Sequence, residues 1–172
     1  MTNTNASHPK PRITVLAIGN LIRSDEGVGV HALRAMQDRL PPGVESLDGG
    51  VLGLNLLPTL RGIDWLLVLD AVNVGHEPGT FVVLHADDIP AISPQKLSVH
   101  QAGFLDTLAA LDLLGERPRR LVIHGVQPLT IDWGDELSAP VANAMPEVVA
   151  RSLALLHSWS EEAARAACSP RR

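Results

Sequence analysis

Two acidic side chains and one histidine are the best candidates for chemistry in this chain. Glu26 follows an apolar segment and a glycine turn, Asp70 directly follows an uninterrupted apolar run, and His100 begins a helical pattern. Each also has an ordinary structural explanation, because acids suit helix starts and turns, and a histidine can pack over a helix start. Brought together, one imidazole and two carboxylates are a ligand set that suits Ni²⁺ or Zn²⁺.

His100 lies in a pattern typical of a helix start. Ser98 and Gln101 have the spacing of a capping box, so we expect His100 in the first turn of a helix. The positive end of the helix dipole should lower the pKa of its imidazole. The ring would then stay neutral, which is the form that binds a metal.

Neighbouring residues offer alternatives to this ligand set. Asp25 competes with Glu26, because adjacent residues in a helical turn point about 100° apart and only one of them is expected to face a site. Asp48-Gly49-Gly50 is more simply a glycine turn than an acid of the aspartic type. We interpret His124 as a packed or solvent-facing histidine. Three ligands would leave coordination positions open, as in catalytic or substrate-sharing metal sites.

The candidates depend on a sheet whose strand ends bring them together. Ligands bind at the carboxyl ends of the strands in open, mostly parallel sheets. Continuous apolar or β-branched runs predict strands. They lie at Arg12 to Ile18, Val44 to Leu47, Trp65 to Leu69, Thr80 to Leu84 and Arg120 to Val126. Helical patterns lie at Glu26 to Leu40, Leu52 to Leu60 (a short helix or loop), Val99 to Leu114 and around Val141 to Leu156.

This alternation predicts a three-layer α/β/α sandwich with a mostly parallel, twisted sheet of about five strands. The connection before Thr80 is too short for a helical crossover, so that strand is expected to be antiparallel or at an edge. Ser24 or Asp25 is expected to cap the first helix, and Pro146 to kink the last helix or mark its start. We expect one domain at 12–163, with flexible tails at 1–11 and 164–172.

Composition excludes several classes of protein. The chain has 172 residues, 45% of them hydrophobic, a formal net charge of −5 and a single cysteine, Cys168. The sequence lacks the basic runs that would suggest nucleic acid as a partner. No apolar run reaches the length of about 18 residues that a membrane span needs. We therefore expect a cytoplasmic protein without a disulfide. The sequence contains no G-x-S-x-G, H-E-x-x-H or Walker A motif.

Several short motifs, in order and spacing from about Val15 to Val149, resemble those of the [NiFe]-hydrogenase maturation endopeptidases. No single motif is decisive, but the ordered set is specific. The matching segments are Gly19-Asn20 with Asp25-Glu26-Gly27-Val28-Gly29, Asp48-Gly49-Gly50 with Gly53, Asp70-Ala71, Pro78-Gly79-Thr80, Ser98-Val99-His100-Gln101, and Gly125-Val126-Gln127-Pro128.

The resemblance implies an activity and a set of site residues. Such proteases remove a short C-terminal extension from the hydrogenase large-subunit precursor after nickel insertion. The family's nickel-recognising ligands correspond here to Glu26, Asp70 and His100. The nickel would arrive with the substrate, and no permanent cofactor is expected. A carboxylate of Asp70 or Asp25 would be the general base.

Three other functions remain open on the sequence. A self-contained zinc peptidase could use the same three ligands, and a nickel-sensing hydrogenase chaperone could bind the large subunit without cutting it. A nucleotide-binding α/β domain is the third, although the missing phosphate loop argues against it.

Overall fold

The computed structural model describes the backbone of residues 10–88 and 99–168, and the side chains of 10–88 and 102–167. Its centre is a five-stranded sheet with the strand order β2-β1-β3-β5-β4. The strands are β1 (Ile13–Ile18), β2 (Val44–Gly50), β3 (Trp65–Ala71), β4 (Phe81–His85) and β5 (Arg120–Val126). Neighbouring strands are parallel except for β4, which pairs antiparallel with β5 at one edge. Both expectations for the sheet are therefore confirmed.

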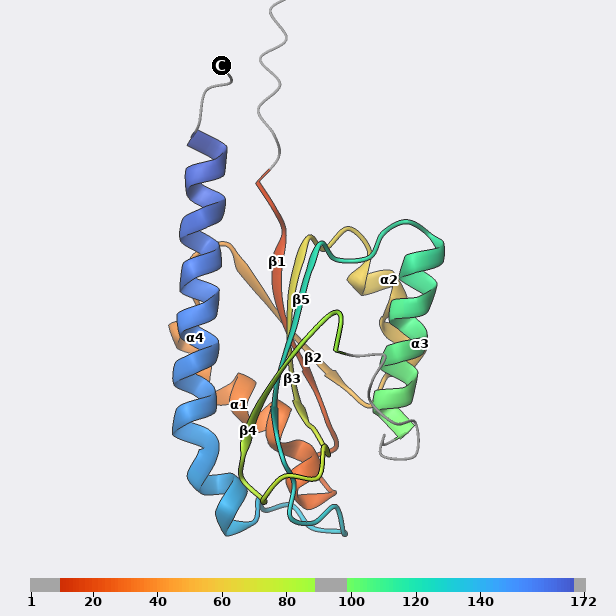
Figure 1. Ribbon diagram of the computed structural model, residues 1–172, viewed down its shortest axis with the longest axis vertical. Coiled ribbons are helices and arrows are strands. Elements are labelled where there is room, and N and C mark those ends of the chain that lie inside the picture. The colour runs from red at the N-terminus through yellow and green to blue at the C-terminus, as the bar shows by residue number, and fades with distance from the viewer. Residues whose placement is uncertain (1–9, 89–98, 169–172) are drawn as a thin grey trace, which may run out of the picture.

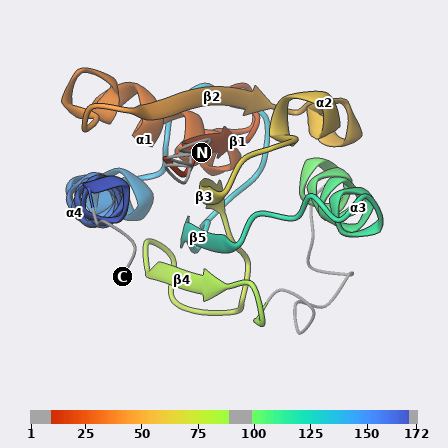
Figure 2. The same cartoon turned by 90° about the horizontal axis from the view of Figure 1, so that it is seen from above.

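Helices cover both faces of this sheet, as the predicted three-layer sandwich requires. In Figure 2, α1 and α4 lie on one side of the strands, and α2 and α3 lie on the other. Their bounds are α1 (Val28–Met36), α2 (Leu57–Leu60), α3 (Val99–Leu113) and α4 (Ala139–Cys168). Three 3₁₀ turns complete the described elements, at Ser24–Gly27, Gln37–Arg39 and Gly53–Leu56.

Strand β3 shows how one strand serves two cores. Successive side chains of a strand point to opposite faces. Leu67 and Leu69 pack with α1 and α4, whereas Leu66 and Val68 pack with α2 and α3. The same alternation places Asp70 on the face that carries α3. The strand therefore directs its one acid toward the side on which His100 begins a helix.

The first helix approaches the sheet more closely than a side chain would allow. A Cβ at Gly29 would meet the carbonyl oxygens of Leu69 and Ile18. A glycine is required here because backbone atoms of three elements share one space. This contact fixes the start of α1, and the turn before it, against the ends of β1 and β3.

The structure corrects several predicted boundaries. The expected helix from Glu26 to Leu40 consists of the 3₁₀ turn Ser24–Gly27, α1 and the 3₁₀ turn Gln37–Arg39. Neither Ser24 nor Asp25 caps it, because neither start has a side-chain cap hydrogen bond. Pro146 lies inside α4 and does not mark its start, and that helix continues to Cys168, well beyond the helical pattern expected around Val141 to Leu156.

Two strands are longer than their apolar runs. Asp70 belongs to β3, because Asp70 and Ala71 pair with Gly125 and Val126 of β5. Asp48-Gly49-Gly50, expected as a turn, is the end of β2 and pairs with β1 across an irregularity between Ala17 and Ile18. In both cases the neighbouring strand continues and supplies hydrogen-bond partners, which local sequence patterns do not reveal.

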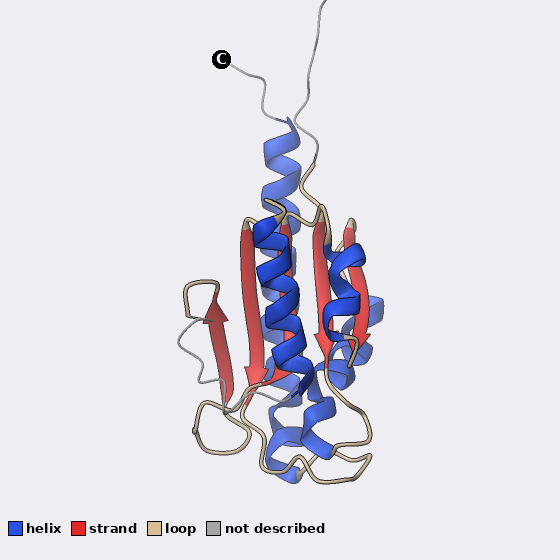
Figure 3. Ribbon diagram, turned by 90° about the vertical axis from the view of Figure 1, so that its right-hand side faces the viewer, coloured by secondary structure: helices blue, strands red, loops and turns tan. Residues whose placement is uncertain are grey.

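The carboxyl ends of the four parallel strands all lie at the same end of the sheet, which is distinct from the lateral edge formed by β4. In Figure 3 their arrowheads point the same way, and β4 points the opposite way. We call this the carboxyl edge, formed by the ends of β1, β2, β3 and β5 and the segments that follow them. The other end of the same strands is the amino edge. Figure 1 shows α3 beginning near the carboxyl edge and running back toward the amino edge.

Candidate functional site

Glu26 lies at the carboxyl edge in the turn between β1 and α1. The turn depends on Gly19, which has a φ of 144° and leaves no room for a Cβ beside the carbonyl oxygen of Glu26. The backbone N–H of Asn20 donates to that same oxygen at 3.2 Å. The side chain of Glu26 is nearly buried, and its Oε2 lies 4.0 Å from Nε of Arg23. The sequence therefore builds a fixed position for a buried carboxylate.

Asp70 lies one residue before the end of β3 and is 6% exposed. Its Oδ1 accepts a hydrogen bond from the backbone N–H of Ala71 at 2.8 Å. The residue beside it in β5 is Gly125, which has no side chain to cover it. A carboxylate in this place is screened from bulk water yet lies where the strand ends open toward ligands.

The backbone of His100 lies in the first turn of α3, as predicted. The start of this helix is anchored beside the 3₁₀ turn Gly53–Leu56, which follows β2, because a Cβ at Gly103 would lie 2.8 Å from Cα of Gly53. The Thr107 hydroxyl also donates to the carbonyl oxygen of Gly53 at 3.0 Å. The helix start thus belongs to the carboxyl edge, on the same face of the sheet as Asp70.

The imidazole of His100 lies outside the described side chains, and so does Ser98 of the expected capping box. Within the part that is described, no group of three histidine, cysteine or acidic side chains could hold a metal ion. The set of Glu26, Asp70 and His100 therefore stays a prediction. What the fold provides is the placement of all three positions at one edge.

Asp25 is fully buried and is engaged by a distant loop. Its Oδ2 accepts hydrogen bonds from the backbone N–H groups of Leu129 and Thr130, at 2.9 and 3.1 Å. Ser138 donates its backbone N–H to Oδ1 at 2.7 Å and its hydroxyl to Oδ2 at 2.8 Å. These bonds join the turn after β1 to the residue before α4. They favour a positioning role for Asp25 over the base role expected as one alternative.

Gln127 is a buried residue of this edge whose role the sequence alone does not predict. It is 5% exposed, and its Oε1 accepts the backbone N–H groups of Val74, Gly75 and His76 at 3.0, 3.0 and 3.1 Å. Its Nε2 donates to Oδ1 of Asn73. One amide thereby holds the whole segment that follows Asp70. Only the motif resemblance pointed to Gln127, since a lone glutamine after a strand carries no chemical pattern.

The remaining candidates belong to structure and not to the site. His124 is buried in β5, where its Nδ1 lies 2.9 Å from the Ser152 hydroxyl and its ring meets Phe81 edge-on. Burial, with the nearby charge of Arg151, lowers the pKa of His124 to about 4. It is therefore a packed neutral histidine, one of the two states expected. Asp48 is exposed, and its Oδ1 accepts the N–H of Gly50.

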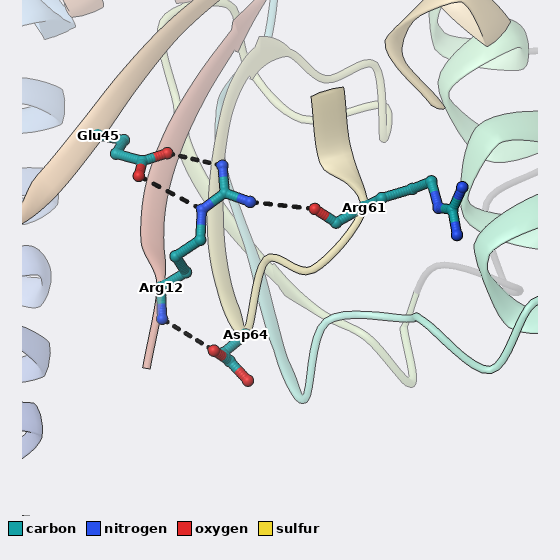
Figure 4. Close-up of polar contacts among 4 residues, drawn as sticks. All are labelled: Arg12, Glu45, Arg61 and Asp64. Atoms are coloured by element: carbon teal, nitrogen blue, oxygen red, sulfur yellow. Dashed lines mark hydrogen bonds and ion pairs between the residues drawn. The ribbon is translucent and has the colours of Figure 1, made fainter. Parts of the chain in front are cut away.

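The amino edge carries acids of a different kind. Figure 4 shows Arg12 donating to the Glu45 carboxylate, to the carbonyl oxygen of Arg61 and, through its backbone N–H, to Asp64. The hydrogen bond from Arg12 lowers the pKa of Glu45. Burial raises the pKa of Asp64, but hydrogen bonds from Arg12 and Arg119 outweigh it and leave that pKa lowered. These are paired, solvated surface charges.

The carboxyl edge therefore presents two nearly buried carboxylates, with a histidine position on the helix beside them. Such a set can complete the coordination of a divalent metal that a bound partner brings, or can activate water near that metal.

Within the described residues, no helix combines the length and apolar character of a membrane span.

Sequence relatives and solved structures agree in kind. Residues 30–155 match the family model described as hydrogenase maturation protease. The chain is 43% identical to hydrogenase expression/formation protein HupD of Rhizobium leguminosarum bv. viciae, over 88% of this chain and 77% of that protein. It is 37% identical to the hydrogenase 2 maturation protease of Escherichia coli K12, over 88% and 94%.

Solved structures that superpose on this chain are also hydrogenase maturation proteases. The hydrogenase maturating endopeptidase HybD from E. coli superposes with a TM-score of 0.80 at 35% identity, covering 86% of this chain and 93% of the other. The [NiFe] hydrogenase maturation protease HybD from Thermococcus kodakarensis gives a TM-score of 0.72 at 27% identity, covering 84% and 99%.

Proposed function

The chain belongs to the hydrogenase maturation protease family and is a peptide hydrolase; we propose that it removes the C-terminal extension of a [NiFe]-hydrogenase large-subunit precursor after nickel insertion. The observation that carries this proposal is the pair of nearly buried carboxylates, Glu26 and Asp70, at the carboxyl edge. A site of this kind suits recognition of a metal that another protein delivers.

Nickel recognition is the step that makes cleavage conditional. Ni²⁺ held by the precursor would complete its coordination with Glu26, Asp70 and the imidazole of His100. A precursor without nickel would lack the ion that joins the two proteins, so it would bind weakly and escape cleavage. In this proposal the enzyme needs no permanent metal of its own, since the ion comes with the substrate.

The same geometry suggests how the peptide bond is attacked. The nickel can orient the tail or act as a Lewis acid on the scissile carbonyl. A carboxylate then takes the proton from the attacking water. We assign this task to Asp70, because both carboxylate oxygens of Asp25 accept hydrogen bonds from the loop 129–138.

Incubation of the purified chain with a nickel-loaded large-subunit precursor tests the activity, with intact-mass spectrometry as the measurement. The proposal predicts loss of a short C-terminal peptide, and Glu26→Gln as a matched variant should leave the precursor intact. A stable complex without any change of mass would contradict the endopeptidase and would identify a chaperone.

A further inference from the structure

Two segments that are distant in sequence pair at the carboxyl edge. They are residues 20–25, which follow β1, and 128–138, which follow β5. The backbone N–H of Ser24 donates to the Gly134 carbonyl oxygen at 2.8 Å, and Gly134 donates to the carbonyl oxygen of Ile22 at 3.1 Å. The approach is close, because a Cβ at Gly134 would lie 2.6 Å from Oγ of Ser24 and would displace that hydroxyl. The two segments therefore form one continuous surface.

This surface exposes large apolar side chains. The four residues are Ile22, Leu129, Ile131 and Trp133, and we call them the rim patch. Trp133 is 75% exposed, and the other three are 42–56% exposed. Apolar residues that gather on paired segments of a surface mark a site of interaction more often than scattered ones do.

The rim patch is held in place although it is exposed. The guanidinium of Arg23 lies over the Trp133 ring, 5.2 Å from its centroid. The buried carboxylate of Asp25 binds the backbone of Leu129 and Thr130 beside it. A tryptophan fixed before binding loses little conformational entropy on contact, which is the character of a binding hot spot.

The rim patch is continuous with the candidate site. The side chain of Arg23 contacts Trp133 on one side, and its Nε faces the carboxylate of Glu26 at 4.0 Å on the other. The Arg23 side chain therefore links the rim patch to the carboxylate of Glu26, one of the predicted nickel ligands. The patch is placed to bind what is cleaved.

The charges around the patch narrow the choice of partner. Asp132, Asp135 and Glu136 are exposed on the same loop as Trp133. An acidic border favours a partner segment that carries basic residues beside its apolar ones, and it disfavours a second copy of this acidic chain, which has a net charge of −5.

We propose that the rim patch binds an apolar segment of the large-subunit precursor, flanked by basic residues, next to the scissile bond. This inference rests on the proposed endopeptidase function and names the contact that positions its substrate. The segment docks on Trp133 while the precursor's nickel reaches Glu26 and Asp70.

The test compares Trp133→Ala with Leu113→Ala on the nickel-loaded precursor. Leu113 is 91% exposed and lies at the far end of α3, so it is a matched loss of an exposed apolar side chain away from the patch. We expect Trp133→Ala to raise KM by roughly thirtyfold, the size of a hot-spot loss, with kcat little changed. Leu113→Ala should behave as wild type, and thermal unfolding should show both variants folded.

Direct binding of the precursor, measured by calorimetry, separates this inference from the function on which it rests. If wild type binds without cleaving, the endopeptidase proposal fails, while weaker binding of Trp133→Ala still supports the patch. An unchanged KM and affinity in Trp133→Ala, or a loss confined to kcat, would overturn the patch. So would a wild-type dimer that Trp133→Ala dissociates, because the surface would then join two copies of this chain.

Discussion

The two edges of the sheet treat their acids in opposite ways. At the amino edge, Glu45 and Asp64 lie in the solvent-exposed network of Arg12 and Arg119. At the carboxyl edge, Asp25, Glu26 and Asp70 are all nearly or fully buried. Exposed ion pairs contribute little to stability, whereas burial of a carboxylate costs free energy that other interactions must offset. Acids that stay buried despite this cost in free energy, as at the carboxyl edge, are therefore the ones to examine for function.

Neutralising either of the two acids predicted to bind nickel, Glu26 or Asp70, should have the largest effect. We expect Glu26→Gln and Asp70→Asn each to slow cleavage of the nickel-loaded precursor by about a thousandfold, because an amide is a poorer metal ligand and no base. Single-turnover rates measured by mass spectrometry would show it. Glu45→Gln at the amino edge is the matched control and should cleave normally. Equal losses in the three variants would erase the distinction between the edges.

Measuring the free energy of unfolding against pH extends the comparison to His124, a buried basic residue of β5 that lies between the two edges. The pKa of His124 is about 4 in the folded chain against 6.5 when exposed, so the unfolded chain takes up the proton first as pH falls. The free energy of unfolding should therefore decrease by about 3 kcal/mol between about pH 6.5 and 4.

Urea denaturation of wild type and His124→Gln at several pH values measures this. In His124→Gln, the free energy of unfolding should no longer decrease as the pH falls from about 6.5 to about 4.5. Below that, the lowered pKa values of Glu45 and Asp64 predict a second loss as they are protonated. A variant with the wild-type slope at pH 5–6 would show that His124 is not the titrating group.

Asp25→Asn separates positioning from chemistry within the carboxyl edge. An amide can replace only part of the carboxylate's hydrogen bonds to Leu129, Thr130 and Ser138, so we expect a loss of about 2 kcal/mol in the free energy of unfolding. Cleavage should fall less than in Glu26→Gln. The reverse order of the two variants in the cleavage assay would make Asp25 the functional acid.

The amino edge should give the smallest effect. Glu45→Gln removes an exposed ion pair with Arg12, and we expect a change of about 0.5 kcal/mol in the free energy of unfolding, smaller still at high salt. Denaturation at low and high ionic strength is the measurement. A loss above about 2 kcal/mol would mean that this network is structural, unlike other exposed pairs.

The architecture was predictable from the sequence because each apolar run corresponds to a strand of the sheet, and each helical pattern corresponds to helices that cover it. The strand Arg120–Val126 was placed with its observed bounds, and the edge strand followed from a short connection. Ends were harder, since Asp70 and Gly50 join their strands only through pairing with a neighbour. Local patterns contain no information on that pairing.

The site was predictable in part. Strand ends and a helix start placed Glu26, Asp70 and His100 at one edge. The partners of Asp25 and Gln127 were not predictable, because they lie more than fifty residues away along the chain. Polar bonds formed by the fold, and not by local spacing, decide which acid is structural.

The dependence of cleavage on the precursor's own nickel tests the central claim most directly. Nickel-loaded and nickel-free large-subunit precursors would be incubated in parallel with metal-free enzyme, and the C-terminal peptide would be quantified by mass spectrometry. The account predicts cleavage of the loaded precursor alone, slowed by orders of magnitude in Glu26→Gln, Asp70→Asn and His100→Ala. Equal cleavage of both precursors, or a need for metal bound to the enzyme, would contradict recognition of the substrate's nickel at the carboxyl edge.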